Sequence, residues 1–82
     1  MSTYGFTEHA YDMLKERGIK KSWVDQTIRN PDMLQNSDDG TVHYIKAIRE
    51  YGSRHLRVIV NQHAQPKRII TVFFDRRLGR RP

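Results

Sequence analysis

One segment, Arg54–Asn61 with the sequence RHLRVIVN, limits the possible folds more than any other part of the chain. It is rich in β-branched residues and contains neither glycine nor proline, which is typical of a β-strand. Its nearly continuous apolar run indicates that both faces of the strand are covered, as in the interior of a sheet. Arg57 is the one charged residue inside that run, so its position needs an explanation.

Two further segments of strand-like composition flank this one, Val42–Arg49 before it and Arg68–Phe74 after it. The connectors between them, residues 50–53 and 62–67, contain glycine or proline and are too short for a helix that crosses the sheet. Consecutive strands joined in this way are antiparallel neighbours. The sequence therefore predicts a three-stranded antiparallel meander with Arg54–Asn61 in the middle.

Two helices are predicted before the strands. Thr7 is a suitable N-cap for a helix over Glu8–Arg17, and Gly18 suits the left-handed position that ends such a helix. Ser22 is the predicted N-cap of the second helix, which ends at Asn30 because proline follows.

The remaining segments are predicted to lack regular structure: residues 1–6 lead into the first helix, residues 32–41 form a loop, and residues 75–82 form a basic tail. The predicted fold class is α+β, with two N-terminal helices packed on one face of a three-stranded antiparallel meander sheet in αα-βββ order. The length favours a single domain over residues 1–82, with its core within residues 6–74.

Alternation along each strand divides the side chains between two faces of the sheet. In the middle strand the set that begins at Leu56 is fully apolar, so we expect it to face the helices and Arg57 to lie on the opposite, open face. In the first strand we expect the set that begins at His43 to face the helices. Tyr44 and Lys46 would then lie beside Arg57. The third strand is apolar on both faces, so its facing stays undetermined.

Basic residues are concentrated in the second half of the chain. Residues 1–40 contain five Lys or Arg against seven Asp or Glu, whereas residues 41–82 contain ten against two. A basic half on a small domain favours a polyanionic partner such as RNA or DNA, or an acidic protein. The alternative is that the net charge of +6 serves solubility alone.

Composition also argues against several classes of protein. The chain has no cysteine, so neither a disulfide framework nor a thiolate zinc site can form. The four histidines are scattered and no acidic cluster suits Mg²⁺, so we expect no metal and no other cofactor. No apolar run approaches transmembrane length, and the N-terminus lacks the features of a signal peptide. We therefore expect a soluble cytoplasmic protein without membrane partners; the oligomeric state is left open.

A candidate catalytic site follows from the predicted open face. Lys46 and Arg57 could hold a phosphate and stabilise the charge that develops when a phosphodiester is attacked. Tyr44, His43 or His9 could move protons, and the dipole of the first helix favours the neutral form of His9. Alternatively, the two cations are ordinary polar residues of an outer sheet face, and His9 packs between helix and sheet. The predicted catalytic residues are His9, Tyr44, Lys46 and Arg57.

Other residues are candidates for contacts with nucleic-acid phosphates. Arg17 is explained equally well as a favourable charge at the end of its helix, and the arginine-rich tail as a solvated end. We expect His43 and His55 to be cross-strand neighbours. The predicted nucleic-acid-binding residues are Arg17, His43, Arg54, Arg76 and Arg77.

The segments FTEHAYDMLKERGI, SWVDQTIRNPD, VHYIKAI, LRVIVN and ITVFF together resemble a bacterial domain family of unknown function, numbered 4258. The resemblance covers Phe6–Phe74, and the residues that match the family motif are His9, Ala10, Arg17, Gly18 and Ile19. Met13 stands where the motif has arginine, and Leu14 where it has methionine. If that arginine has a role in the family, this chain lacks it.

That family is in turn similar to the RelE- and BrnT-like toxins, which are small α+β domains. This more remote resemblance implies a RelE-like fold, metal-independent cleavage of RNA, and an antitoxin as protein partner. It rests on topology and basic character, so it is an analogy and carries over no single residue. We therefore expect a small toxin-like domain that acts on RNA. The alternatives are a non-catalytic module that binds nucleic acid or protein, and a structural or regulatory protein whose open face is an interface.

Overall fold

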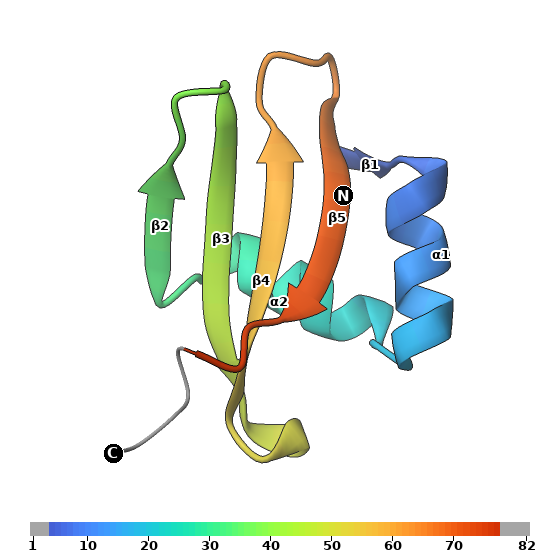
Figure 1. The fold of residues 1–82 in the computed structure, drawn as a ribbon, viewed down its shortest axis with the longest axis vertical. Coiled ribbons are helices and arrows are strands. Elements are labelled where there is room, and N and C mark those ends of the chain that lie inside the picture. Colours follow the sequence, from blue (N-terminus) through green and yellow to red (C-terminus); the bar gives the residue numbers. More distant parts are fainter. Residues whose placement is uncertain (1–3, 78–82) are drawn as a thin grey trace.

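The computed structural model describes residues 4–77, which form two α-helices and a five-stranded mixed sheet (Figure 1). In chain order the elements are β1 (Tyr4–Phe6), α1 (Glu8–Arg17), α2 (Lys21–Arg29), β2 (Met33–Asn36), β3 (Thr41–Ile48), the 3-10 helix η1 (Arg49–Tyr51), β4 (Arg54–Asn61) and β5 (Lys67–Phe74). The strand order β1-β5-β4-β3-β2 places β4 at the centre of the sheet. No helix among residues 4–77 is long and apolar enough to cross a membrane.

The predicted three-stranded meander is wrong, because one short strand is added at each of its edges to give five strands. The lead-in forms β1, which pairs parallel with β5. Part of the predicted loop forms β2, which pairs antiparallel with β3. Each is only three or four residues long, so neither has enough sequence to show an alternating pattern. The predicted antiparallel order of the three long strands, β3, β4 and β5, is confirmed.

The first helix begins and ends where its capping residues predict. The hydroxyl oxygen of Thr7 accepts a hydrogen bond from the backbone N–H of Ala10 at 3.1 Å. At the other end Gly18 has φ of 62°, and the N–H of Ile19 donates to the carbonyl of Leu14 at 2.9 Å. This is the Schellman arrangement, which satisfies the last carbonyls of the helix.

The predicted start of the second helix is wrong by two residues. Its N-cap is Lys20 rather than Ser22, and no side chain makes a capping hydrogen bond there. The helix depends instead on packing, because Trp23, Val24 and Thr27 are buried on its inner side. Its end at Asn30, before the proline, is as predicted.

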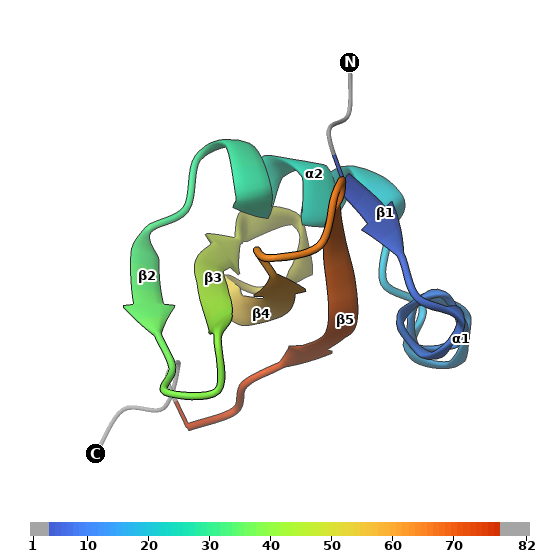
Figure 2. The ribbon, with the colours of Figure 1, turned by 90° about the horizontal axis from the view of Figure 1, so that it is seen from above.

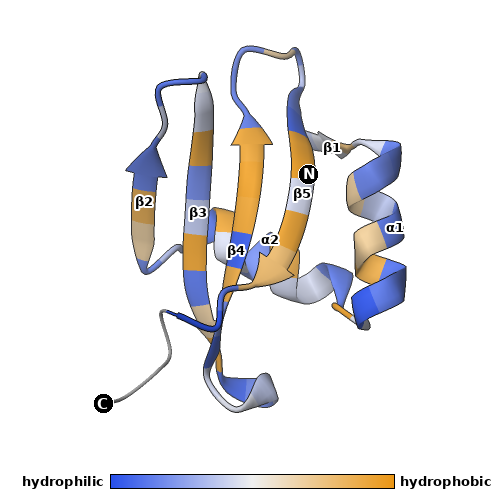
Figure 3. Ribbon diagram, viewed as in Figure 1, coloured by the Kyte–Doolittle hydropathy of each residue, from blue (hydrophilic) through white to orange (hydrophobic). Residues whose placement is uncertain are grey.

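The helices do not cover the sheet equally. Helix α2 lies across one face, against β3 and β4, whereas α1 lies beside β5 and β1 at the sheet edge (Figures 1 and 2). The apolar colouring in Figure 3 is strongest along β4 and β5, which the helices pack against. The buried residues of this core are Ala10, Leu14, Ile19, Trp23, Val24, Ile48, Leu56, Val58, Val60, Ile69 and Val72. We call the side of the sheet away from α2 the uncovered face.

The predicted facing is right for β4 and wrong for β3. The apolar set of β4 that begins at Leu56 belongs to the helix-side core, and Arg57 lies on the uncovered face. Tyr44 is opposite Val58 and Lys46 is opposite Leu56, so both lie on the helix side. Directly opposed residues of a ladder point to the same face, which excludes the predicted trio of Tyr44, Lys46 and Arg57.

A bulge explains why β5 is apolar on both faces. The register shifts between Ile59 and Val60, which lie opposite Thr71 and Ile69, so Ile70 is the extra residue. The bulge moves residues on either side of it out of simple alternation. Ile69 therefore joins the helix-side core, while Thr71 faces the uncovered side.

Candidate functional site

Four segments meet at Arg57 on the uncovered face. We call this group the Arg57 cluster: its members are Gln35, Ser37, His43, Arg57 and Asp75. Residues of β2, β3 and β4 are brought together by pairing, since Gln35 lies opposite His43 and Ile45 lies opposite Arg57. Asp75 directly follows β5, and its N–H donates to the carbonyl of His55 at 2.8 Å, which holds the chain against β4.

The guanidinium of Arg57 divides its hydrogen bonds between two sides. Its Nε and Nη2 lie 3.0 and 2.9 Å from Oδ2 of Asp75. Its Nη1 donates to Oε1 of Gln35 at 3.2 Å and lies 2.7 Å from Nδ1 of His43. Arg57 and Asp75 are only 8% and 4% exposed, so this is a buried ion pair. Nη1 points to the more exposed partners, because Gln35 is exposed and His43 is half-buried.

Asp75 remains an anion at neutral pH. Burial by itself raises its pKa, but hydrogen bonds from Arg77 and from Arg57 outweigh this effect and lower the pKa below its usual range. A carboxylate in a buried position fixes the orientation of the guanidinium, because two guanidinium nitrogens share one of its oxygens.

His43 is held neutral between two partners. Because Arg57 only donates, Nδ1 of His43 must accept, and the ring proton lies on Nε2, which is 3.2 Å from Oγ of Ser37. Burial lowers the pKa of His43, and the positive charge of Arg57 lowers it further. Asp39 in the preceding turn acts in the opposite direction without reversing the shift. The ring is thus a hydrogen-bond donor toward Ser37 at neutral pH.

Further exposed cations lie on β5 and directly after it. Arg77 has an 87% exposed side chain and lies 3.4 Å from Oδ1 of Asp75. Arg76 is exposed beside it, and Arg68 is exposed at the far end, opposite Asn61. The half-buried ring of Phe73 lies opposite Arg57. Positive charge with an aromatic ring is an arrangement that suits a nucleic-acid strand.

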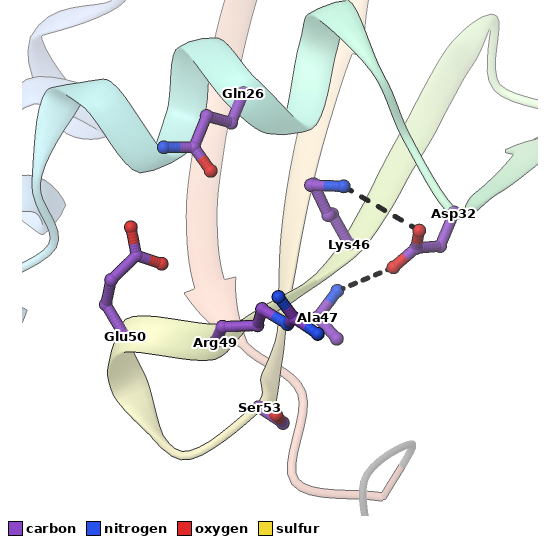
Figure 4. A pocket seen from close by; sticks show the side chains of 7 residues that line it. All are labelled: Gln26, Asp32, Lys46, Ala47, Arg49, Glu50 and Ser53. Carbon is purple, nitrogen blue, oxygen red and sulfur yellow. Dashed lines mark hydrogen bonds and ion pairs between the residues drawn. The ribbon is translucent and has the colours of Figure 1, made fainter.

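Lys46 belongs to a separate hollow on the other side of the sheet (Figure 4). The hollow has a volume of about 630 Å³ and lies between α2, β3 and η1. Lys46 Nζ is 3.8 Å from Asp32, whose other oxygen accepts the N–H of Ala47 at 2.9 Å. The carboxylate of Asp32 thus holds the segment before β2 against β3, and the ion pair with Lys46 contributes to this contact. We therefore assign Lys46 a structural role. The other residues that line the hollow are Gln26, Arg49, Glu50 and Ser53.

The structure separates the remaining predicted site residues. His9 and Arg17 are both exposed on α1, and Arg54 lies with its guanidinium 4.9 Å from the ring centre of Tyr51. His55 is opposite Ala47 rather than His43, so the predicted histidine pair is wrong. Of the predicted residues, the Arg57 cluster contains Arg57 and His43, with Arg77 in contact through Asp75. Whether any of these residues is catalytic stays a prediction.

Sequence reasoning missed Gln35, Ser37 and Asp75. The first two lie in or beside the unpredicted strand β2. Asp75 carried a usable signal, because it is one of only two acidic residues after position 40 and directly follows an apolar strand that ends beside Arg57. Within residues 4–77 no group of three or more histidine or acidic side chains is placed to hold a metal ion.

The family described as "Domain of unknown function (DUF4258)" matches residues 6–74. No curated protein and no solved structure matches the chain. The match covers every strand and both helices except the first two residues of β1. The more remote resemblance to RelE- and BrnT-like toxins therefore stays an expectation.

Proposed function

The chain belongs to the DUF4258 family, which has no assigned function, and from its own geometry we propose that it acts on RNA through the uncovered face. The Arg57 cluster carries this proposal. It places an oriented guanidinium 2.7 Å from an imidazole, on a sheet face that neither helix of residues 4–77 covers. RNA offers phosphates to such a guanidinium and bases to the half-buried ring of Phe73 opposite it.

The distribution of charge supports a polyanionic ligand. Arg68 on β5 and Arg76 and Arg77 just after it are exposed, whereas the acidic Asp75 is buried and makes ion pairs with two arginines. Phosphate contacts of this kind give affinity without base specificity. We therefore expect binding that depends strongly on salt and little on RNA sequence.

Two activities are compatible with binding at this face. The first is metal-independent cleavage of RNA, which the contact between His43 and Arg57 favours, because a phosphate held there would lie within reach of a group able to move protons. The second is binding without turnover. Binding without turnover is favoured because the guanidinium of Arg57 already donates hydrogen bonds to side chains of this domain. It is also favoured because Tyr44 and Lys46 lie on the other side of the sheet.

A toxin-like role would add a protein partner. The family resemblance suggests an antitoxin that blocks the RNA-binding face, and expression of this chain alone should then arrest bacterial growth. Co-expression of a short neighbouring reading frame that restores growth would support this part of the proposal. Normal growth at high expression of the folded chain would contradict it.

The binding proposal is tested by fluorescence anisotropy with a labelled single-stranded RNA across a salt series. The variant Arg68→Gln/Arg76→Gln removes two exposed cations, one on β5 and one just after it. We expect the slope of log affinity against log salt to fall by about 1.4, on the basis of about 0.7 for each phosphate that is no longer neutralised. The matched control, Lys15→Gln/Arg29→Gln, removes two exposed cations from the helices. An equal decrease in both variants would show that only net charge matters and would contradict the proposal.

Incubation of the protein with RNA in excess EDTA separates the two activities. Cleavage that is absent in His43→Gln but present in His63→Gln, a change in the exposed β4–β5 loop, would establish a ribonuclease. Intact RNA at concentrations that saturate binding would leave the non-catalytic module as the function. Absence of RNA binding at low salt would reject both.

A further inference from the structure

We propose that a phosphate group of bound RNA displaces His43 from Nη1 of Arg57, and that the released imidazole takes up a proton and becomes the second cation that holds the phosphate. This inference rests on the proposed function and adds a specific phosphate-binding pair with a proton-coupled mode of binding. It follows from how the three polar partners of Arg57, which are Asp75, Gln35 and His43, are placed.

One side of the guanidinium is closed to a ligand and the other is not. Nε and Nη2 are committed to Asp75, which is 4% exposed, and Asp75 itself is anchored by its N–H on His55. Nη1 instead meets one exposed and one half-buried neutral side chain, Gln35 and His43. A phosphate oxygen is a stronger acceptor for an arginine N–H than a neutral amide or imidazole. Exchange at Nη1 is therefore favourable, and exchange at Asp75 is not.

Displacement changes what His43 can do. In the free protein its Nδ1 lone pair is occupied by Arg57 at 2.7 Å, and a proton there would place two cations in contact. Once a phosphate binds Nη1, that lone pair is free, and the negative charge of the ligand offsets the positive charge of Arg57. The protonated ring can then donate to the phosphate from Nδ1, while Nε2 keeps its contact with Ser37 at 3.2 Å.

The groups around His43 come from two strands, β2 and β4, and from the connection between β2 and β3. Arg57 from β4 opposes protonation, and Asp39 from the turn favours it. Gln35 from β2 and Ser37 after it are neutral at every pH of interest. Hydrogen bonds from Thr41 lower the pKa of Asp39, so its charge stays constant over the pH range in which His43 titrates.

Phosphate binding at Arg57 and proton binding at His43 are then thermodynamically linked. If binding takes up one proton at His43, lower pH must strengthen binding, and binding must raise the proton affinity of His43 by the same factor. When the bound phosphate offsets the charge of Arg57, the proton affinity of the half-buried His43 should rise about tenfold.

The test uses the whole chain with a 2′-O-methyl single-stranded RNA, which binds as a polyanion and resists cleavage. NMR of the histidine rings follows the protonation of His43 with and without this RNA, and His63 in the same spectra serves as an internal reference. We expect about tenfold tighter proton binding at His43 in the complex and no comparable change at His63. In parallel, affinity should rise as the pH falls from 7.5 to 5.5 for the wild type and for His63→Gln, but clearly less for His43→Gln.

Each outcome has one meaning. RNA that binds while the ring signals of His43 keep their free-state titration overturns the inference and leaves the proposed function standing. Equal pH dependence in His43→Gln and the wild type has the same meaning. No binding of the RNA at any pH at low salt rejects the proposed function, and the inference with it.

Discussion

Replacing Asp75 by asparagine should destabilise this domain severely. The substitution keeps the size of the side chain and an oxygen able to accept from the N–H of Arg77, which lies 3.1 Å away in the native protein. It removes the negative charge that opposes Arg57. The arginine, 8% exposed, then lies buried beside a neutral amide and the neutral ring of His43.

The magnitude follows from the burial of the pair. Breaking a buried ion pair by removing one partner costs about 3–5 kcal/mol, because the other charge is left uncompensated. A domain of this length has a total free energy of unfolding of about 4–12 kcal/mol. At about 4–8 °C per kcal/mol for a domain of 60–100 residues, the melting midpoint should fall by at least about 12 °C.

The measurement is thermal and urea unfolding followed by circular dichroism, with two comparison variants. Arg29→Gln removes a surface pair whose side chains are 71% and 39% exposed, and should cost less than about 0.5 kcal/mol. Arg57→Met/Asp75→Leu removes both buried charges and should recover most of the stability that Asp75→Asn removes. If Asp75→Asn unfolds at the same midpoint as Arg29→Gln, the ion pair is not buried and our description of the cluster is wrong.

Three further outcomes are expected. Because the pKa of His43 is lowered in the folded protein, the unfolded chain binds more protons near pH 6, and the free energy of unfolding should fall as pH drops below about 6.5. Urea titrations at several pH values should show a smaller fall in His43→Gln. Gly18→Ala forces a side chain into a φ of 62° and should cost about 1–2 kcal/mol by urea unfolding, with an unchanged result disproving the Schellman ending. The ring of Tyr51 packs against Trp23 and Phe74 at centroid distances of 5.5 and 4.7 Å. Tyr51→Ala should therefore lower the free energy of unfolding by at least about 1 kcal/mol and shift the fluorescence of the tryptophan. Unaltered emission would argue against this packing.

Features specified by local sequence could be predicted. The bounds of helix α1 can be predicted because Thr7 and Gly18 act on neighbouring backbone groups. The order of β3, β4 and β5 followed from connectors that permit only hairpins. The residues of β1 and β2 carry no such signal, since each of these short strands depends on pairing with a longer neighbouring strand.

The facing of β3 could not be read from its pattern. Its buried residues, Val42, Ile45 and Ile48, recur every third position, so alternation favours neither face. Both faces of β3 are in fact buried at some point, because Ile48 joins the helix-side core and Ile45, 0% exposed, lies on the uncovered face. This ambiguity led to the wrong grouping of Tyr44 and Lys46 with Arg57.

Two residues of the candidate site, Arg57 and His43, could be predicted from the sequence, but their contacts could not. Arg57 stands out in the sequence as the one charge inside an apolar strand. Its partner, Asp75, is 18 residues away and becomes a neighbour only because β5 returns beside β4. His43 was identified as a candidate, whereas its contact with Arg57 depends on the register of β3 against β4. Long-range pairing therefore decides which of the predicted residues share a site.

Photo-crosslinking tests the central claim, that RNA binds the uncovered face, most directly. A single-stranded RNA containing 4-thiouridine is bound to the full chain at low salt and irradiated, and the crosslinked peptides are identified by mass spectrometry. We predict crosslinks in the segments around His43 and Phe73, with a much weaker signal in Arg68→Gln/Arg76→Gln. Crosslinks confined to α1 and α2, or none at RNA concentrations well above those used for binding, would contradict the account.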